Sequence, residues 1–319
     1  MNFPVGIVGV GKCVPNTIVT NQDLVAGGLD TTDEWIVSRT GIRERRIADA
    51  ETRTSHLAYG ASQEAIKDAG IQPTDIDMVI VATSTPDYAL FPSTACLLQD
   101  RLGLRTDIGA VDVSAACTGF NYALSMAEQY VATGACRYVL VVAGDVLSRH
   151  VDWTDRSICI LFGDGAGACV VGRVPDGFGL IDSKLYSDGS YADILQVKPD
   201  GPSHIYMDGR AVFKVAVNAV VPAVEAILKK NGLVGSDVDL LVMHQANLRI
   251  IEATRERLGI PEDHVMKMIE IYGNTSAASI PMALCDAKQG GRLKRGSVVL
   301  LAGFGAGFTW GTTLLRWAY

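Results

Sequence analysis

The sequence lacks the features of a membrane-spanning, secreted or nucleic-acid-binding protein. No uninterrupted apolar run comes close to the ~18 residues that a membrane-spanning helix needs. The first residues do not form a charged segment followed by an apolar one, as a signal peptide would. The 28 lysines and arginines are outnumbered by 35 acidic residues, so the net charge of -7 offers no attraction for nucleic acid. We therefore predict a soluble cytoplasmic protein.

Paired cysteines and metal-ligand clusters are also missing. The seven cysteines and five histidines are scattered, with no CxxC pair and no cysteine–histidine cluster. Structural zinc sites and disulfide frameworks both need such regular spacing. We therefore expect reduced thiols, and neither a metal nor any other cofactor.

What the sequence does contain is an internal repeat. Residues 70–81 (GIQPTDIDMVIV) match residues 232–243 (GLVGSDVDLLVM) at an offset of 162, about half of the 319-residue chain. A second matching pair has an offset of 159: residues 139–144 and 298–303. Self-similarity of this kind indicates two related units. We assign residues 1–172 to an N-terminal half and residues 173–319 to a C-terminal half.

Apolar, strand-like runs alternate with helical patterns in both halves. In the first half the patterns predict helices over residues 55–69 and 120–133, and strands over residues 78–82 and 138–143. Continuous apolar runs of this length are typical of parallel strands that are buried on both faces. The sequence thus predicts an α/β fold of two βαβ-rich halves, with strand ends and helix starts from both halves meeting at one site.

Cys117 occupies a predicted strand-to-helix elbow. The apolar run 110–113 leads into it, and a helical pattern follows. Free amides at the start of a helix stabilise a thiolate, but only by about 0.3–1 kcal/mol, which lowers a pKa by less than one. We therefore expect a second group to assist the thiol. His244, directly after the apolar run 240–243, is the candidate.

The repeat adds an asparagine to this pair. Cys117 falls opposite Ala277 in the second half, inside a turn that contains Asn274. A lone histidine at the end of a strand is usually a hydrogen-bonded core group. A cysteine, a histidine and an asparagine at equivalent strand ends instead indicate a covalent catalytic site.

A glycine-rich segment, residues 303–311, follows the predicted strand 298–302. Small residues allow the backbone to approach a ligand, and a free amide here could join that of Cys117 in an oxyanion hole. The alternative is a glycine-rich hairpin without a catalytic role.

Two other glycine-rich segments imitate nucleotide-binding motifs. Residues 6–11 have the spacing GxxGxG, and Pro15 prevents a following helix, so we interpret them as a strand end and turn. Residues 163–168 lack the GK[ST] ending of a phosphate loop. We interpret them as a tight turn with close backbone packing.

Five segments together resemble the β-ketoacyl-acyl carrier protein synthase III family of the thiolase superfamily. They are residues 32–42 (TDEWIVSRTGI), 162–167 (FGDGAG), 244–249 (HQANLR), 273–276 (GNTS) and 307–311 (GFTWG). The resemblance implies a thiolase-like fold with layers in the order αβαβα. It also implies an acyltransferase that condenses a short acyl-CoA, such as acetyl-CoA, with malonyl-acyl carrier protein and so initiates fatty-acid biosynthesis.

The resemblance also implies roles for individual residues. Cys117 is the nucleophile, His244 and Asn274 bind the thioester oxygen during decarboxylation, and the amides of Cys117 and Ala306 form the oxyanion hole. The implied CoA-binding residues are Trp35, Arg39, Arg156, Phe213 and Asn247, with Gly209 beside the pantetheine. The implied contacts of acyl carrier protein are Lys214 and Arg249. The family forms homodimers, in which Phe91 would limit primer length from the partner subunit.

Two alternatives remain open at this point. One is a ketoacyl synthase of secondary metabolism that uses an unusual primer. The other is an inactive homologue that serves as a dimer partner, although an intact Cys117, His244 and Asn274 argue against it.

Overall fold

Two mixed β-sheets form the centre of the protein. The computed structural model describes residues 3–198, 200 and 203–319. The first sheet has five strands, in the order β1 (Val5–Cys13), β7 (Gly165–Arg173), β6 (Tyr138–Asp145), β4 (Met78–Ala82) and β5 (Gly109–Val113). The second has four, in the order β11 (Leu240–Met243), β12 (Val298–Gly305), β13 (Thr309–Arg316) and β8 (Gly179–Ser187).

The two sheets repeat one pattern of strand directions. In the first, β4 runs parallel to β5 and β6, whereas β6, β7 and β1 are antiparallel neighbours. In the second, β11 runs parallel to β12, whereas β12, β13 and β8 are antiparallel neighbours. The expectation of parallel strands was therefore only partly right, because β12 and β13 are consecutive strands of a hairpin. We propose the boundary between halves at residues 172 and 173, where β7 ends.

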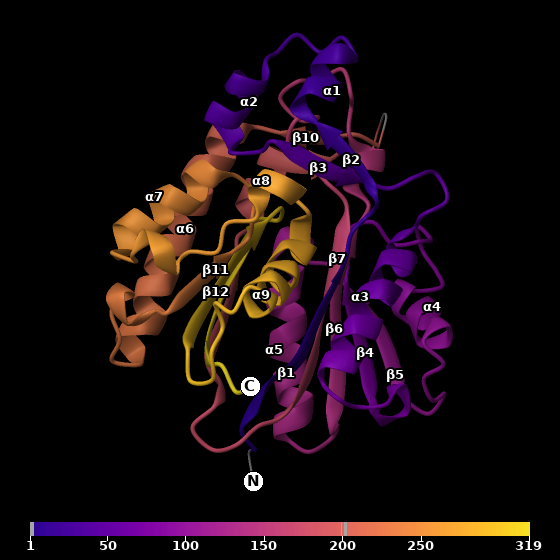
Figure 1. The fold of residues 1–319 in the computed structure, drawn as a ribbon, viewed down its shortest axis with the longest axis vertical. Helices are drawn as coiled ribbons and strands as arrows, with labels where there is room; N and C mark the ends of the chain where they lie inside the picture. The colour runs from indigo at the N-terminus through magenta and orange to yellow at the C-terminus, as the bar shows by residue number, and fades with distance from the viewer. Residues whose placement is uncertain (1–2, 199, 201–202) are drawn as a thin grey trace.

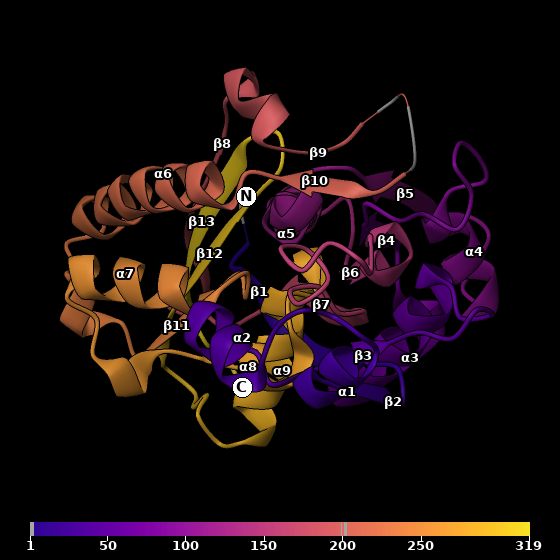
Figure 2. The same cartoon turned by 90° about the horizontal axis from the view of Figure 1, so that it is seen from above.

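The helices form three layers around these sheets, as Figure 2 shows from above. Between the sheets lie α5 (Gly119–Ala132) and α9 (Ser279–Gln289). Outside the first sheet lie α3 (Thr54–Asp68) and α4 (Thr94–Arg101), and outside the second lie α6 (Gly209–Lys230) and α7 (Leu248–Leu258). This αβαβα order confirms the expected layered fold.

The remaining elements cluster at the end of the molecule that Figure 1 shows uppermost. They are α1 (Asn21–Ala26), α2 (Asp33–Thr40), α8 (Ile269–Tyr272), the paired strands β2 (Thr17–Thr20) and β3 (Glu44–Ile47), and the paired strands β9 (Leu195–Val197) and β10 (Ile205–Met207). They lie at the end of the sheets where the central helices begin.

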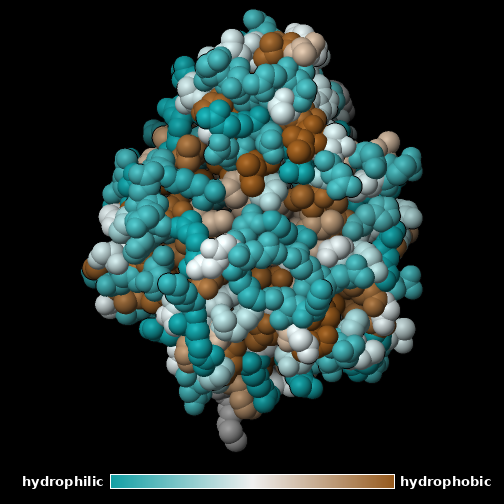
Figure 3. Space-filling view, viewed as in Figure 1, coloured by the Kyte–Doolittle hydropathy of each residue, from teal (hydrophilic) through white to brown (hydrophobic). Residues whose placement is uncertain are grey.

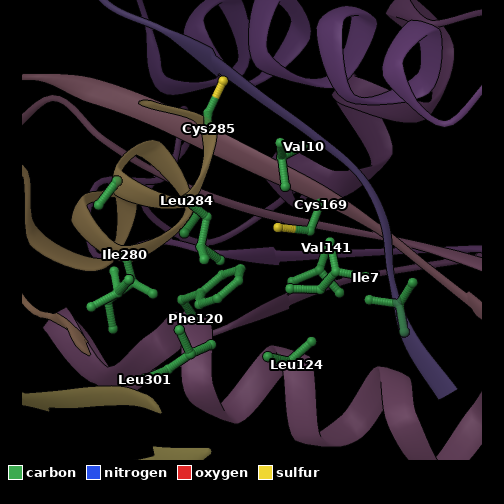
Figure 4. Close-up of a cluster of buried hydrophobic side chains, with 14 of the residues drawn as sticks. Ile7, Val10, Phe120, Leu124, Val141, Cys169, Ile280, Leu284, Cys285 and Leu301 are labelled. Carbon is green, nitrogen blue, oxygen red and sulfur yellow. The ribbon is translucent and has the colours of Figure 1, made fainter. Parts of the chain in front are cut away.

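The central layer fixes the position of the two helix starts. Buried residues of α5 recur at helical spacing, as Phe120, Leu124, Ala127 and Val131 do, and all four are fully buried. Figure 4 shows Phe120 and Leu124 among side chains of α9 and of both sheets. Burying one such large apolar side chain contributes roughly 1.5–3 kcal/mol. The helices α5 and α9 are therefore held firmly with their N-terminal ends in the same region.

The two glycine-rich segments that imitate nucleotide-binding motifs lie mostly in strands. Residues 6–11 belong to β1 and residues 165–168 to β7, so the prediction of turns there was wrong. Gly9 and Gly11 lie inside β1, where an added Cβ would come within 2.4 and 2.3 Å of carbonyl oxygens of α3. Gly167 lies inside β7, where a Cβ would come within 2.6 Å of the amide of Met282 in α9. Close helix–strand packing explains these glycines.

The helix α6 is long and apolar enough to span a membrane by composition, with 22 residues. Its apolar side chains, such as Val217, Val220 and Val224, are instead buried against the second sheet. The outer face seen in Figure 3 is mainly hydrophilic, with hydrophobic residues in separate groups. α6 thus contributes one apolar face to the core beside the second sheet.

Candidate active site

A cavity of about 1040 Å³ lies where the two halves meet. Cys117, His244, Asn274 and Ala306 all line it. The cavity is also lined by Trp35, Arg39, Gly209, Phe213, Asn247 and Arg249. It is large enough for a substantial organic ligand. Three of the candidate residues, Phe91, Arg156 and Lys214, do not line it.

Cys117 lies in a tight turn, Ala116–Thr118, which leads directly into α5. The second half has the same turn, Ser276–Ala278, leading into α9. In both turns the first residue has a positive φ, 46° at Ala116 and 54° at Ser276, which is uncommon for residues other than glycine. The two elbows are therefore equivalent, and Cys117 corresponds to Ala277, as the repeat predicts.

The hairpin β12–β13 closes over this elbow. An added Cβ on Gly305 would come within 2.6 Å of the Cys117 amide nitrogen. Only glycine permits this approach, which brings Ala306 to the wall of the cavity. The glycine-rich segment thus forms a hairpin turn and also shapes the site.

Burial dominates the acidity of the Cys117 thiol. The side chain is 9% exposed, and its burial raises the thiol pKa to about 12, against which a hydrogen bond from Ser276 acts in part. The start of α5 stabilises a thiolate by only about 0.3–1 kcal/mol. Lowering the thiol pKa by one would take about 1.36 kcal/mol, so this effect is too small to offset burial. The prediction that this elbow lowers the pKa of the thiol is therefore wrong, because the effect of burial is larger than that of the helix start.

His244 is a buried, neutral hydrogen-bond donor. Burial lowers its pKa to about 3, so the ring is uncharged at neutral pH and cannot pair as a cation with a Cys117 thiolate. Its Nδ1 lies 2.8 Å from the Ser279 hydroxyl oxygen, which also accepts from the amide of Gln245. If Ser279 donates its hydroxyl proton to Nδ1, the ring proton lies on Nε2. The ring packs edge-on against Phe304, with 5.1 Å between centroids.

Asn274 is oriented by the elbow of the second half. Its side-chain oxygen accepts a hydrogen bond of 2.9 Å from the amide of Ser276. Its side-chain NH₂ group donates to no group in the described part of the chain. Because Asn274 lines the cavity, this group is available to an oxygen atom of a bound substrate.

The buried His244 is expected to weaken the fold in acid. Its ordinary pKa is 6.5 and its folded pKa about 3, so the unfolded chain binds a proton that the folded chain excludes. Stability is full above pH 6.5 and is lost as the pH falls toward 3. Between pH 7 and 5 the loss is about 2 kcal/mol. Urea unfolding of the wild type and of His244→Gln at pH 7 and pH 5 measures this. Between these pH values the free energy of unfolding should fall by about 2 kcal/mol less in the variant. Equal losses in the two proteins would contradict this assignment.

Planar and charged side chains surround the outer part of the cavity. The Trp35 ring lies 4.9 Å from the Arg156 guanidinium and 5.8 Å from that of Arg39. Asn247 donates to the Arg39 carbonyl oxygen at 3.1 Å. Arg156 is thus beside the site, although it does not line the cavity.

A second aromatic–arginine pair lies on α6 and α7. The Arg249 guanidinium is 5.8 Å from the Phe213 ring, and both residues line the cavity. Lys214, next to Phe213 in α6, is exposed. Gly209 begins α6, and its nearest neighbour would be 3.9 Å from an added Cβ, so the backbone there is accessible.

Phe91 lies on the loop between β4 and α4 and is 80% exposed. Phe91 is therefore not part of the hydrophobic core of this chain. Its neighbours Tyr88 and Leu90 are also exposed, at 52% and 85%. The loop is nevertheless anchored, because the Asp87 carboxylate accepts hydrogen bonds from the amide and hydroxyl of Ser55. It holds three apolar side chains in solvent.

The structure adds three polar residues that sequence reasoning did not assign: Asp145, Ser276 and Ser279. Ser276 donates from its hydroxyl to the Cys117 sulfur at 3.4 Å. Asp145 is the last residue of β6 and is fully buried. Its position directly after the apolar run 139–144 was the available signal, the same kind that singled out His244.

All seven cysteines are free thiols. Within residues 3–198, 200 and 203–319, no group of three His, Cys, Asp or Glu residues could hold a metal ion.

Comparison with known proteins gives matches along the whole chain. Residues 111–189 match the family profile described as 3-oxoacyl-[acyl-carrier-protein (ACP)] synthase III, and residues 228–317 match the profile of its C-terminal part. Beta-ketoacyl-[acyl-carrier-protein] synthase III of Listeria monocytogenes is 51% identical over 312 residues, which cover 98% of each chain. The enzyme of the same name from Oceanobacillus iheyensis is 49% identical over 313 residues, which cover 98% of this chain and 99% of its own.

Solved structures agree with these matches. The crystal structure of 3-oxoacyl-[acyl-carrier-protein] synthase III from Aquifex aeolicus superimposes with a TM-score of 0.94 at 45% identity, covering 98% of this chain and 100% of that one. The priming β-ketosynthase of the R1128 polyketide pathway superimposes with a TM-score of 0.93 at 38% identity, covering 99% and 97%.

Proposed function

Because the chain belongs to the β-ketoacyl-acyl carrier protein synthase III family, whose members are condensing acyltransferases that initiate fatty-acid synthesis, we propose that Cys117, His244 and Asn274 carry out its reaction. One observation supports the assignment most strongly. The three side chains come from different elements of the two halves, yet they line the same cavity.

In the first half-reaction, the Cys117 sulfur attacks the carbonyl carbon of an acyl-CoA. A new C–S bond forms to Cys117, the C–S bond to CoA breaks, and CoA leaves as its thiol. We assign the developing oxyanion to the backbone amides of Cys117 and Ala306. The packing of Gly305 against the Cys117 amide supports this, since it brings the two segments together.

In the second half-reaction, malonyl-acyl carrier protein replaces CoA in the cavity. The C–C bond to its carboxylate breaks, carbon dioxide leaves, and the electron pair moves onto the thioester as an enolate. We propose that Nε2–H of His244 and the NH₂ group of Asn274 donate to the enolate oxygen. The enolate carbon attacks the acyl-enzyme, and Cys117 leaves from the 3-ketoacyl product.

We propose that CoA binds along the outer part of the cavity. The flat Trp35 ring and the Arg156 guanidinium offer stacking surfaces for the adenine, and Arg39 offers a charge for phosphate. The pantetheine arm would pass Gly209, Phe213 and Asn247, which line the path toward Cys117.

We also propose Lys214 and Arg249 as contacts of acyl carrier protein, which is acidic. Both are exposed, and Arg249 lies at the cavity that the carrier's arm must enter. The net charge of -7 repels an acidic partner at long range, so these cations would act as a local patch.

A homodimer is the proposed assembly. The loop residues Tyr88, Leu90 and Phe91 expose apolar surface, and β5 leaves the edge of the first sheet uncovered. A second copy would cover both features through a twofold axis. We place residues 82–95 near this interface, so that Phe91 enters the acyl pocket of the partner subunit.

Phe91→Thr should lengthen the range of accepted primers. An aromatic ring at the end of the pocket leaves room for acetyl or propionyl groups, and forcing extra methylenes into filled space costs about 1–3 kcal/mol, or about 5- to 150-fold in rate. A panel of acyl-CoA primers with malonyl-acyl carrier protein, followed by intact-protein mass spectrometry, measures this. The wild type should prefer acetyl-CoA or propionyl-CoA, and the variant should also accept hexanoyl-CoA.

Leu90→Thr is the matched control, since it removes a neighbouring exposed side chain. Its primer profile should equal that of the wild type. Three results would contradict the proposal that Phe91 limits primer length. They are a wild-type preference for octanoyl-CoA, an unchanged primer profile in Phe91→Thr, and a monomeric mass in light scattering. Turnover of an unusual primer alone would favour the priming role in secondary metabolism that the polyketide relative suggests.

We further propose that the enzyme works in the cytoplasm and without a metal or redox cofactor. The residues assigned above supply a nucleophile and hydrogen-bond donors for both oxyanions, and neither role calls for a metal or a redox group.

A further inference from the structure

Two threonine hydroxyls join the elbow of Cys117 to the hairpin that carries Ala306. Thr118, the residue after Cys117, donates from its hydroxyl to the carbonyl oxygen of Thr309 at 3.1 Å. The two threonine hydroxyl oxygens are 3.0 Å apart. Thr118 is fully buried in the turn before α5, whereas Thr309 begins β13, three residues after Ala306. This pair thus links segments that are 191 positions apart in the sequence.

The Thr309 hydroxyl lies between the two segments. Its oxygen is 3.2 Å from the carbonyl oxygen of Ala115, on the elbow, and 3.2 Å from the carbonyl oxygen of Ala306, in its own hairpin. Together with Thr118 Oγ1 it has three oxygen neighbours for its one proton. Movement of the hairpin away from the elbow would break the hydrogen bond from Thr118 and separate the Thr309 hydroxyl from Ala115.

The packing of Gly305 between the same segments limits only how closely they approach. An added Cβ on Gly305 would come within 2.6 Å of the Cys117 amide nitrogen, so the backbones already touch. Such contact resists compression, but the dispersion attraction of a single atom pair resists separation poorly. Hydrogen bonds are stronger and directional, so the two threonines resist separation. The glycine and the threonines together therefore determine the distance between elbow and hairpin.

This distance matters because each segment carries one donor of the proposed oxyanion hole. The amide of Cys117 belongs to the turn before α5, and that of Ala306 to the turn between β12 and β13. Two donors stabilise one oxyanion only when both lie about 2.7–3.1 Å from the position that it will occupy. Their alignment depends on the noncovalent contacts between the two turns.

We propose that Thr118 and Thr309 are positioning residues that align the amides of Cys117 and Ala306 for acyl transfer. This role rests on the proposed function, in which the two amides bind the oxyanion. Neither threonine lines the cavity, so both act through the backbone of their neighbours and not by touching the substrate. The oxyanion forms on the acyl carbon twice, when Cys117 attacks acyl-CoA and when the enolate attacks the acyl-enzyme. The alignment serves both half-reactions.

Thr118→Val and Thr309→Val test this role, because valine replaces the hydroxyl by a methyl group. Misplacement of a catalytic group by about 1 Å can slow a reaction by about 100-fold, so acetyl-CoA should acylate each variant about 10- to 100-fold more slowly. Condensation of preformed acyl-enzyme should slow by a similar factor. The acetyl-CoA concentration that gives half the maximal rate should not change, because the oxyanion develops only in the transition state.

Alkylation by iodoacetamide distinguishes alignment of the amides from damage to the thiol. In this reaction the sulfur displaces iodide from a saturated carbon, so no oxyanion develops. Because all seven cysteines are free thiols, the rate is followed by mass spectrometry at the peptide that contains Cys117. Both valine variants should be alkylated there at the wild-type rate at pH 7.

Further variants test the link between the two hydroxyls. Because both threonines serve one link, the double valine variant should be no slower than the slower single variant. Thr118→Ser keeps the hydroxyl and should recover most of the rate that valine loses. Thr312→Val is the control, since Thr312 is buried on the same strand and its hydroxyl has no hydrogen-bond partner in the described part of the chain. It should acylate and condense like the wild type.

Any of three outcomes would overturn this role of the threonines. The first is acylation of both valine variants at the wild-type rate. The second is alkylation that slows as much as acylation, which would indicate a disturbed thiol. The third is an equal loss in Thr118→Ser and Thr118→Val. None of them would affect the assignment of Cys117 as the nucleophile, which fails only if Cys117→Ala still becomes acylated.

Discussion

Cys117→Ala is expected to form no acyl-enzyme when it is exposed to acetyl-CoA. The sulfur is the nucleophile of the proposed reaction, and alanine offers no atom that can bond to the acyl carbon. Cys117→Ser should fail as well, because an alcohol in this buried position holds its proton more tightly than a thiol. Intact-protein mass spectrometry after incubation detects the added acetyl group, and the steady-state formation of 3-ketoacyl product should vanish with it.

Cys13→Ala and Cys285→Ala serve as controls for this result. Neither residue lines the cavity, and burial raises the thiol pKa of both, so both variants should be acylated like the wild type. An acetyl group on Cys117→Ala would refute the assignment. So would loss of acylation in Cys13→Ala alone.

His244→Ala and Asn274→Ala are each expected to lose condensation by about 100- to 1000-fold, the usual effect of removing one donor to a developing oxyanion. Acylation should fall much less, because its oxyanion is assigned to backbone amides. The two half-reactions are measured separately: acyl transfer by mass, and condensation by single turnover of preformed acyl-enzyme with malonyl-acyl carrier protein.

A third variant tests the orientation of the histidine. Ser279→Ala removes the hydroxyl that we expect to keep the His244 proton on Nε2. It should slow condensation but less than His244→Ala, since the ring itself remains. A variant of His244 or Asn274 that condenses at a near wild-type rate while failing to accept the first acyl group would reverse the roles assigned here.

Much of the fold could be predicted because its signals are local. The strand predicted over residues 78–82 is β4 (Met78–Ala82), and the helix predicted over residues 120–133 is α5 (Gly119–Ala132). The antiparallel strands β1 and β7 could not be recognised in the same way. Strands buried on both faces have the same apolar pattern whichever direction their neighbours run.

The nucleophile and its donors could also be predicted, since each follows an apolar strand or lies in a turn that the repeat makes equivalent. Their electrostatics could not. The thiol pKa depends on how closely Gly305 and Ser276 cover Cys117, and these contacts join residues more than 150 positions apart. Ser276 lay inside a recognised segment, but its contact with the sulfur of Cys117 forms only in the folded chain.

The division of the site between the halves also has a consequence for biosynthesis of the chain. A ribosome completes the elbow with Cys117 long before it makes His244, Asn274 and the Gly305 hairpin. Until then the thiol lacks the segments that bury it, and an exposed thiol has an ordinary pKa near 8.5. The nascent chain therefore carries a reactive sulfur without the donors that stabilise an enolate. A truncated translation product could be oxidised or acylated at Cys117, but it could not divert malonyl groups into condensation.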